Sequence, residues 1–182
     1  FELPAAGDYG VGMVFFPPHA GRADQCRSVI NQNLRKLGLK LLGYRRVPGD
    51  PSILGRDAQQ TEPQIEQVFI GKPDGMDQQE LERKLFVLRK FTGHLINSTV
   101  AKEKDEFYIA SLSTRTLVYK GQFTTCQVQQ YYLDLQDPEL KSTLAMFHSR
   151  FSTNTFPAWR RAQPFRYLSH NGEINTVQGN MN

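Results

Sequence analysis

Two clusters of polar residues near the end of the chain have the residue types that bind a small carboxylate-bearing substrate. The first runs from His148 to Thr155, reads HSRFSTNT, and follows the apolar residues 144–147. We expect this apolar run to be a buried strand, which places Arg150 at the edge of a sheet. A planar guanidinium there suits two-pronged binding of a carboxylate. The hydroxyl of Thr153 is among the neighbouring groups that would complete a polar pocket.

The second cluster, His170-Asn171-Gly172-Glu173, contains an Asn-Gly pair with two interpretations. It follows residues 165–168, which we expect to form a second strand. Asn-Gly is common in tight turns because both residues tolerate a positive φ, so a plain hairpin turn is one interpretation. The other is an oxyanion hole for acyl transfer, in which the Asn171 amide and the Gly172 N–H donate to one oxygen. Spacing alone favours the turn.

These motifs closely resemble the amidotransferase domain of glutamate synthase large subunits, which are glutamine-hydrolysing N-terminal-nucleophile hydrolases. HSRFSTNTFP and HNGEINT carry the resemblance, and it extends over most of residues 9–182 through YGVGMVFF, EPQIEQVFIG, ERKLFVLRK, FYIASLSTRTLVYKG and DLQDPEL. In that family the Arg of an H-[ST]-R motif binds the α-carboxylate of glutamine, and an Asn-Gly pair stabilises the tetrahedral oxyanion. The resemblance therefore assigns substrate binding to Arg150 and a catalytic role to Asn171 and Gly172.

The resemblance also implies a fold and a place within a longer protein. The fold is a four-layer αββα sandwich of the N-terminal-nucleophile hydrolase type, incomplete in this chain. The family's nucleophile is an N-terminal Cys, whereas this chain begins at Phe1 and its first cysteine is Cys26. We expect residues 1–182 to be an internal part of a type 2 glutamine amidotransferase domain, lacking the nucleophile-bearing N-terminus and the downstream part. Such a fragment is expected to be inactive alone.

For the parent enzyme the resemblance implies that ammonia from glutamine is used to convert 2-oxoglutarate to glutamate, with FMN and an iron–sulfur cluster. Neither cofactor, nor a metal, has a recognisable site in this fragment. The expected partners are glutamine, the remainder of the chain and optionally a small reductase subunit, with no nucleic acid and no membrane. The expected location is the cytoplasm, or a plastid if the source is photosynthetic.

Composition and charge fit a globular domain and argue against several other classes of protein. The 182 residues are 39% hydrophobic and 22% charged, which is ordinary for a soluble domain. No apolar run approaches the roughly 20 residues that span a bilayer. Two cysteines 100 positions apart argue against a disulfide framework or a zinc site. From Lys141 onward there are five basic residues and one acidic residue, and this local positive charge favours an anionic ligand at Arg150. For Arg160, Arg161 and Arg166 a solvated face is the favoured interpretation.

Two other classes of function compete with an amidotransferase. A nucleic-acid-binding module is one, because aromatic residues alternate with arginines in Trp159-Arg160-Arg161 and Phe165-Arg166-Tyr167. Aromatic side chains stack on bases, and arginines bind phosphates with an affinity that falls steeply as salt rises. A non-catalytic structural domain is the other class, and the isolated chain without a nucleophile is expected to behave as one.

The remaining elements are expected to form an α+β scaffold with a largely antiparallel sheet, because strands and helices mix without strict alternation. Strand patterns predict strands at 9–16, 39–47 and 64–70 and a hairpin of 107–112 with 116–119. Helical spacing of apolar residues predicts helices at 22–37 and 81–95 (behind a capping box at 77–80). A short helical stretch is expected at 124–133, and a further helix is expected to begin in 174–181. Cys26 falls on the core face of the first helix, where a free cysteine is usually a small buried hydrophobe.

Overall fold

The structure, a computed structural model, describes residues 1–101, 106–151 and 155–170. The chain divides into two compact units. Unit 1 comprises Phe1–Arg46 and Pro63–Leu117, and unit 2 comprises Val47–Glu62 and Val118–Asn182. Among the described residues, no helix combines the length and the apolar character needed to cross a membrane.

Unit 1 is built on a four-stranded antiparallel sheet with the strand order β2-β3-β1-β4. The strands are β1 (Tyr9–Phe16), β2 (Lys40–Arg46), β3 (Gln64–Gly71) and β4 (Tyr108–Ser113). Each lies within one residue of its predicted position. The predicted hairpin partner of β4, residues 116–119, is not a strand. Instead the Ser113 hydroxyl accepts from the N–H groups of Arg115 and Thr116 in a turn, after which the chain passes into unit 2.

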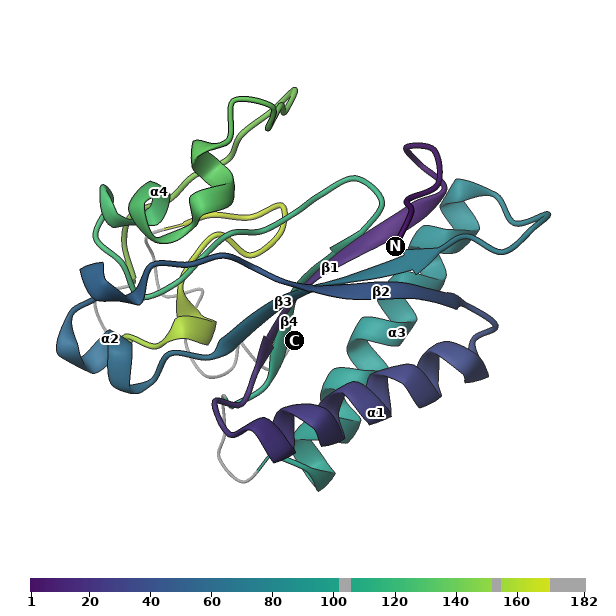
Figure 1. The fold of residues 1–182 in the computed structure, drawn as a ribbon, viewed down its shortest axis with the longest axis horizontal. Helices are drawn as coiled ribbons and strands as arrows, with labels where there is room; N and C mark the ends of the chain where they lie inside the picture. The colour runs from purple at the N-terminus through teal and green to yellow at the C-terminus, as the bar shows by residue number, and fades with distance from the viewer. Residues whose placement is uncertain (102–105, 152–154, 171–182) are drawn as a thin grey trace. The chain divides into compact units, whose positions relative to one another are not determined.

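Two long helices, α1 (Ala20–Lys36) and α3 (Gln78–Thr99), cover one face of this sheet (Figure 1). The predicted cap of α3 is confirmed, because the Asp77 carboxylate accepts from the Glu80 N–H at 2.7 Å. Close packing of α3 on β1 requires glycine, since a Cβ at Gly10 would lie 2.4 Å from Leu85 Cδ1. Fully or almost fully buried side chains fill the space between helices and sheet: Val14, Phe16, Cys26, Ile30, Leu34, Val68, Ile70, Leu81, Leu85, Leu88 and Ile96.

The opposite face of the sheet also buries large apolar side chains. Side chains alternate across a strand, so Met13 and Phe15 of β1 point away from the face that carries Val14 and Phe16. Both Met13 and Phe15 are 0% exposed. Phe15 stacks on Tyr108 of the neighbouring strand with ring centroids 4.4 Å apart. β1 therefore buries apolar side chains on both faces of the sheet, with the buried polar residues Gln67 and Ser111 as the cross-strand partners of Met13.

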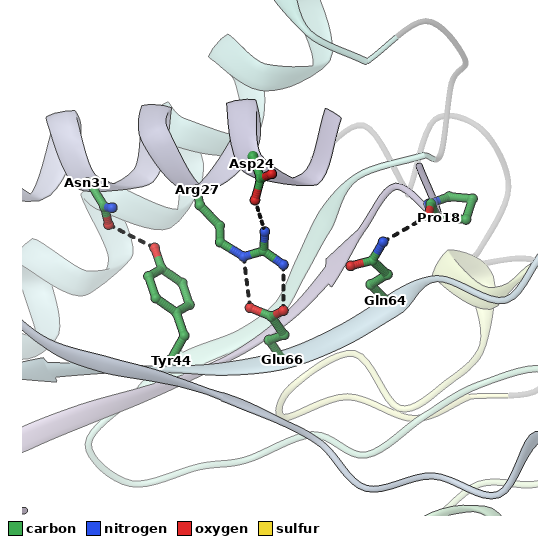
Figure 2. A network of polar contacts seen from close by, with 7 residues as sticks. All are labelled: Pro18, Asp24, Arg27, Asn31, Tyr44, Gln64 and Glu66. Carbon is green, nitrogen blue, oxygen red and sulfur yellow. Dashed lines mark hydrogen bonds and ion pairs between the residues drawn. The ribbon is translucent and has the colours of Figure 1, made fainter. Parts of the chain in front are cut away.

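A polar network joins α1 to the sheet within unit 1 (Figure 2). The Arg27 guanidinium donates to both carboxylate oxygens of Glu66 on β3, at 3.0 and 2.5 Å, and to Asp24 at 2.5 Å. The guanidinium also lies 4.9 Å from the centroid of the Phe16 ring. Nearby, the Tyr44 hydroxyl donates to the Asn31 side chain at 2.9 Å. The two-pronged Arg27–Glu66 pair therefore fixes the position of α1 along β3.

Replacement of Arg27 by Met is expected to loosen this junction. The Glu66 side chain is only 12% exposed, so the substitution leaves a mostly buried carboxylate without its cation. The expected loss is about 2 kcal/mol of opening free energy for amides in α1 and β3, measurable by hydrogen exchange of the full-length protein. Arg56→Met is the matched control, because Arg56 and its partner Asp57 are both 86% exposed. Equal exchange in the two variants would contradict a structural role for Arg27.

Unit 2 has short helical segments around an aromatic cluster. The segments are η1 (Pro51–Ile53), α2 (Arg56–Gln60), α4 (Gln127–Tyr131), η2 (Leu133–Gln136) and η3 (Trp159–Arg161). The predicted helix at 124–133 is thus confirmed over its central part as α4. The cluster consists of Tyr119, Phe123, Tyr131, Tyr132 and Trp159, with neighbouring ring centroids 4.8–5.6 Å apart.

The aromatic cluster contacts the backbone at two places, once through a hydrogen bond and once through close packing. The Trp159 indole N–H donates to the Ala58 carbonyl at 3.0 Å. Gly121 lies against the rings, where a Cβ would approach Phe123 to 2.4 Å and Trp159 to 2.6 Å. Glycine is therefore required at this position by close contact with the cluster.

Two predicted strands of unit 2 are wrong. Leu144 and Phe147 are 75% and 89% exposed and irregular in conformation, so residues 144–147 are neither buried nor a strand. Residues 165–168 form a tight turn with a single bridge between Phe165 and Leu168. An apolar run becomes a strand only where a neighbour satisfies its backbone groups, and the described part of unit 2 contains no extended strand to do so. The predicted helix at 174–181 lies outside the described residues.

Candidate functional site

Four residues were predicted to bind or activate a substrate: Arg150, Thr153, Asn171 and Gly172. The structure describes one of them, Arg150. It lies in an irregular, exposed segment and not at the edge of a sheet, so the predicted placement is wrong. Thr153, Asn171 and Gly172 lie outside the described residues. All four belong to unit 2.

His148, which opens the H-S-R motif, has a buried polar atom that needs a partner. Its Nε2 is buried and makes no hydrogen bond to the residues that the structure describes. Buried polar atoms are nearly always hydrogen-bonded in folded proteins. The His148 imidazole is therefore suited to form a hydrogen bond, as donor or acceptor, with a ligand that binds next to Ser149 and Arg150.

Lys120 is the most deeply buried cation among the described residues of unit 2. Its ammonium donates to the carbonyls of Arg160 and Ala162 at 2.7 and 2.9 Å, and it lies 4.8 Å from the centroid of the Phe165 ring. Burial, together with the positive charges of Arg160 and Arg166, lowers the pKa of Lys120 to about 7. A lysine amine keeps at least two N–H donors in either protonation state, so both carbonyls stay bonded.

Gln163 joins this anchored segment to the second predicted motif. Its Oε1 accepts from the His170 N–H at 2.5 Å, and its Nε2 donates to the His170 carbonyl. His170 is the residue that precedes Asn171 in the sequence. Sequence patterns had singled out neither Lys120 nor Gln163. The one available signal was the position of Lys120, which directly follows the apolar residues 117–119 and precedes Gly121. A lysine beside such an apolar run is expected to be paired if it is buried.

The remaining candidates from the sequence have structural roles. Trp159, which a nucleic-acid-binding surface would use for stacking, is 4% exposed and packs in the aromatic cluster. Burial, with a further contribution from Glu106, raises the pKa of the Cys26 thiol to about 12, so this cysteine stays protonated and is a poor nucleophile. Across the described ranges no three His, Cys, Asp or Glu side chains are grouped so as to hold a metal ion.

Comparison with known proteins agrees with the motifs. Residues 1–182 match the family described as class-II glutamine amidotransferases. Glutamate synthase [NADH] of Schizosaccharomyces pombe is 50% identical over 186 residues, which cover 99% of this chain and 9% of that protein. The NADPH glutamate synthase large chain of Bacillus subtilis is 48% identical over 182 residues, 100% of this chain and 12% of that one.

A third relative is named as ferredoxin-dependent. The chloroplastic ferredoxin-dependent glutamate synthase of Oryza sativa subsp. japonica is 45% identical over 175 residues, 95% of this chain and 11% of that protein. The chain thus spans about a tenth of the length of these relatives. Because the family match extends over all 182 residues and includes both polar motifs, the chain belongs to the class-II glutamine amidotransferases.

Proposed function

We propose that this chain is part of the glutaminase domain of a glutamate synthase, which releases ammonia from glutamine for glutamate formation from 2-oxoglutarate. The observation that carries the proposal is the family match over the whole chain, with glutamate synthases at 45–50% identity as relatives. The buried position of Trp159 further weighs against the nucleic-acid-binding alternative.

In this proposal glutamine is held by its α-carboxylate and hydrolysed at its side-chain amide. Arg150 binds the carboxylate, for which its exposed guanidinium is suited, and Thr153 adds a hydroxyl to the same pocket. Asn171 and Gly172 donate hydrogen bonds to the oxyanion that forms when a thiolate attacks the amide carbon. The tetrahedral intermediate then collapses, the C–N bond breaks, and ammonia leaves with a proton from an acid in the site, which leaves a γ-glutamyl thioester. Water then attacks the thioester carbon, the C–S bond breaks, and glutamate leaves as the thiol is regenerated.

The attacking thiolate is not supplied by Cys26, because that thiol is buried and its pKa is raised. We assign the nucleophile to an N-terminal cysteine upstream of Phe1, and residues 1–182 to an internal part of the amidotransferase domain. The four-layer αββα sandwich belongs to the same proposal. It is supported by the second face of the sheet, where Met13 and Phe15 are fully buried, since an inner layer needs a covering layer on each side.

FMN and an iron–sulfur cluster would be bound by other parts of the proposed parent enzyme. Iron–sulfur clusters are held by about four cysteine thiolates, and this chain has two cysteines, of which Cys26 is buried and Cys126 exposed. The residues present therefore do not fit a cluster. Further partners in the proposal are the remainder of the chain and, in some forms, a reductase subunit. The proposed location is the cytoplasm, or a plastid in a photosynthetic source.

The proposal is tested by following the amide nitrogen of glutamine. The full-length protein is supplied with amide-¹⁵N-glutamine, 2-oxoglutarate and a reductant, and products are examined by mass spectrometry. The label is expected in the α-amino group of newly formed glutamate. Label in free ammonia alone would indicate a glutaminase that is not a glutamate synthase. Retention of all label in glutamine by the folded protein would refute the proposed function.

A further inference from the structure

The outer face of α3 differs from the outer face of α1, the other helix on the same side of the sheet (Figure 1). From residue 24 to residue 36 the exposed residues of α1 are all polar or charged: Asp24, Gln25, Ser28, Gln32, Arg35 and Lys36. On α3, in contrast, Phe86, Val87 and Phe91 are 55%, 48% and 51% exposed. A surface helix normally has polar residues on the side away from the core. The apolar outer face of α3 therefore has a reason that packing within unit 1 does not supply.

The exposed apolar residues of α3 form one continuous surface with two cations. Side chains three or four positions apart are neighbours on a helix. Phe86 is therefore beside Lys90, Val87 is beside Phe91, and Arg83 lies one turn before Phe86 and Val87. Arg83 and Lys90 are both exposed. These five residues are called the α3 patch. Single exposed apolar residues are ordinary on a protein surface, whereas a contiguous group marks an interaction site.

Gly93 provides an independent observation at the edge of the α3 patch. It lies within α3, seven residues after Phe86 and three after Lys90, so it is on the same side of the helix as both. Glycine inside a helix is less stable than alanine. Beyond the chain neighbours of Gly93 and the α3 backbone, no atom of the described residues lies within 4 Å of an ideal Cβ there. A residue without a side chain lets another group approach the α3 backbone closely.

The charge of the α3 patch favours one kind of occupant. Residues 83–99 contain four Lys or Arg and no Asp or Glu, and the Arg89 guanidinium lies 5.4 Å from the centroid of the Phe86 ring. If two copies docked through the same patch, Arg83 and Lys90 of one copy would face those of the other, and like charges across an interface oppose binding. A surface with an apolar centre and acidic residues around it is complementary.

We propose that the α3 patch is the docking surface for another domain of the same polypeptide, which presents an apolar centre surrounded by acidic residues. The chain spans about a tenth of the length of its glutamate synthase relatives, so a polypeptide of that length has further domains to occupy the patch. The inference uses the longer polypeptide of the proposed function but not glutamine hydrolysis. A domain on the same chain is held at a high effective concentration, so a small patch suffices for docking.

The occupant is identified by photo-cross-linking of the full-length protein with Phe91→p-benzoylphenylalanine. This substitution keeps an aromatic side chain in the α3 patch and forms a covalent bond to a neighbouring group on irradiation. The protein is prepared as a mixture of ¹⁴N and ¹⁵N chains, and cross-linked peptides are analysed by mass spectrometry. We expect Phe91 to be joined to peptides outside residues 1–182, always with the same isotope on both sides, and at sites with Asp or Glu nearby.

Thiol labelling measures whether the α3 patch is covered. Val87→Cys reports on the α3 patch, and Ser28→Cys, at an exposed position of α1, is the matched control. Each labelling rate in the folded full-length protein is divided by the rate in urea. We expect Val87→Cys to be labelled about 10-fold more slowly than Ser28→Cys, because the undocked state is populated to about 10% or less.

Gly93→Leu tests the close approach to α3. Leucine is a better helix former than glycine but fills the space that the occupant needs. Added to Val87→Cys, it should raise the labelling rate about 10-fold, to that of the undocked patch. Gln25→Leu adds the same side chain on the exposed face of α1 and should leave the labelling of Val87→Cys unchanged. Equal effects of the two leucines would overturn the role of Gly93 and with it the inference.

The other occupants give different results, and each would overturn the inference. Cross-links between ¹⁴N and ¹⁵N chains would identify a second copy, and cross-links confined to residues 1–182 would place the occupant within this chain. Equal labelling of Val87→Cys and Ser28→Cys would show an uncovered patch. Protection that appears only with phosphatidylglycerol vesicles would identify a membrane surface. Both measurements are independent of turnover, so an absence of glutamine hydrolysis would refute the proposed function alone.

Discussion

Replacement of Asn171 by Asp in the full-length protein is expected to lower kcat for glutamine hydrolysis by on the order of 10²–10³. Asp tolerates turn geometry as Asn does, but an ionised carboxylate presents an acceptor and a negative charge where the amide donated to the oxyanion. Glutamine binding and thermal stability should change much less. The measurement is steady-state turnover with 2-oxoglutarate and a reductant supplied, alongside thermal unfolding.

The same substitution separates the oxyanion hole from a plain hairpin turn. Asn97→Asp, at an exposed position of α3, is the control for the added charge and should leave kcat unchanged. Near-normal turnover in a folded Asn171→Asp protein would overturn the oxyanion assignment. Gly172→Ala gives a second comparison, because a loss of stability is expected only if a positive-φ turn is broken there, and a loss of kcat alone if a side chain crowds the substrate.

The second large effect is expected at Arg150. Arg150→Lys keeps the positive charge but loses the planar two-pronged geometry that matches a carboxylate. We expect kcat/KM for glutamine to fall on the order of 10- to 100-fold, as for the loss of a charge-assisted hydrogen bond of about 1.5–3 kcal/mol. Most of the effect should appear in KM, since the α-carboxylate is bound in the ground state and in the transition state alike.

A matched control for Arg150 is available in the same unit. Arg56 is 86% exposed, and its ion pair with Asp57 spans 3.7 Å, so Arg56→Lys should leave kcat and KM unchanged. If Arg150→Lys gave the same kinetic constants as Arg56→Lys, Arg150 would be a surface residue without a role in binding glutamine.

The elements of unit 1 were predictable because their signals are local. Leu81, Leu85 and Leu88 recur at helical spacing behind the Asp77 cap, and the structure places all three in the core. Strand patterns likewise located β1 and β3 to within one residue. In unit 2 the apolar run 144–147 predicted a buried strand, but Leu144 and Phe147 are exposed. Whether an apolar run is buried depends on partners distant in sequence, and its own pattern does not specify them.

The motif resemblance selected Arg150 and Asn171 as candidate site residues. The family match supports the family, and the roles of these two residues stay predictions. The contacts of Lys120 and Gln163 had no pattern to reveal them. The bonds from Lys120 to two carbonyls and from Gln163 to His170 join side chains to backbone, and such pairs carry no periodicity. They could be found only from the fold.

The most direct test of Arg150 and Asn171-Gly172 as the substrate site is a crystal structure of the full-length protein with bound glutamine aldehyde, an analogue that carries an aldehyde in place of the side-chain amide and forms a hemithioacetal with the nucleophile. We expect the α-carboxylate of the analogue to lie about 2.7–3.2 Å from the Arg150 guanidinium nitrogens. We also expect the hemithioacetal oxygen to lie about 2.7–3.1 Å from Asn171 Nδ2 and from the Gly172 nitrogen. A bound analogue whose carboxylate is held by other residues, with Arg150 in solvent and Asn171 turned away from the oxygen, would contradict this assignment.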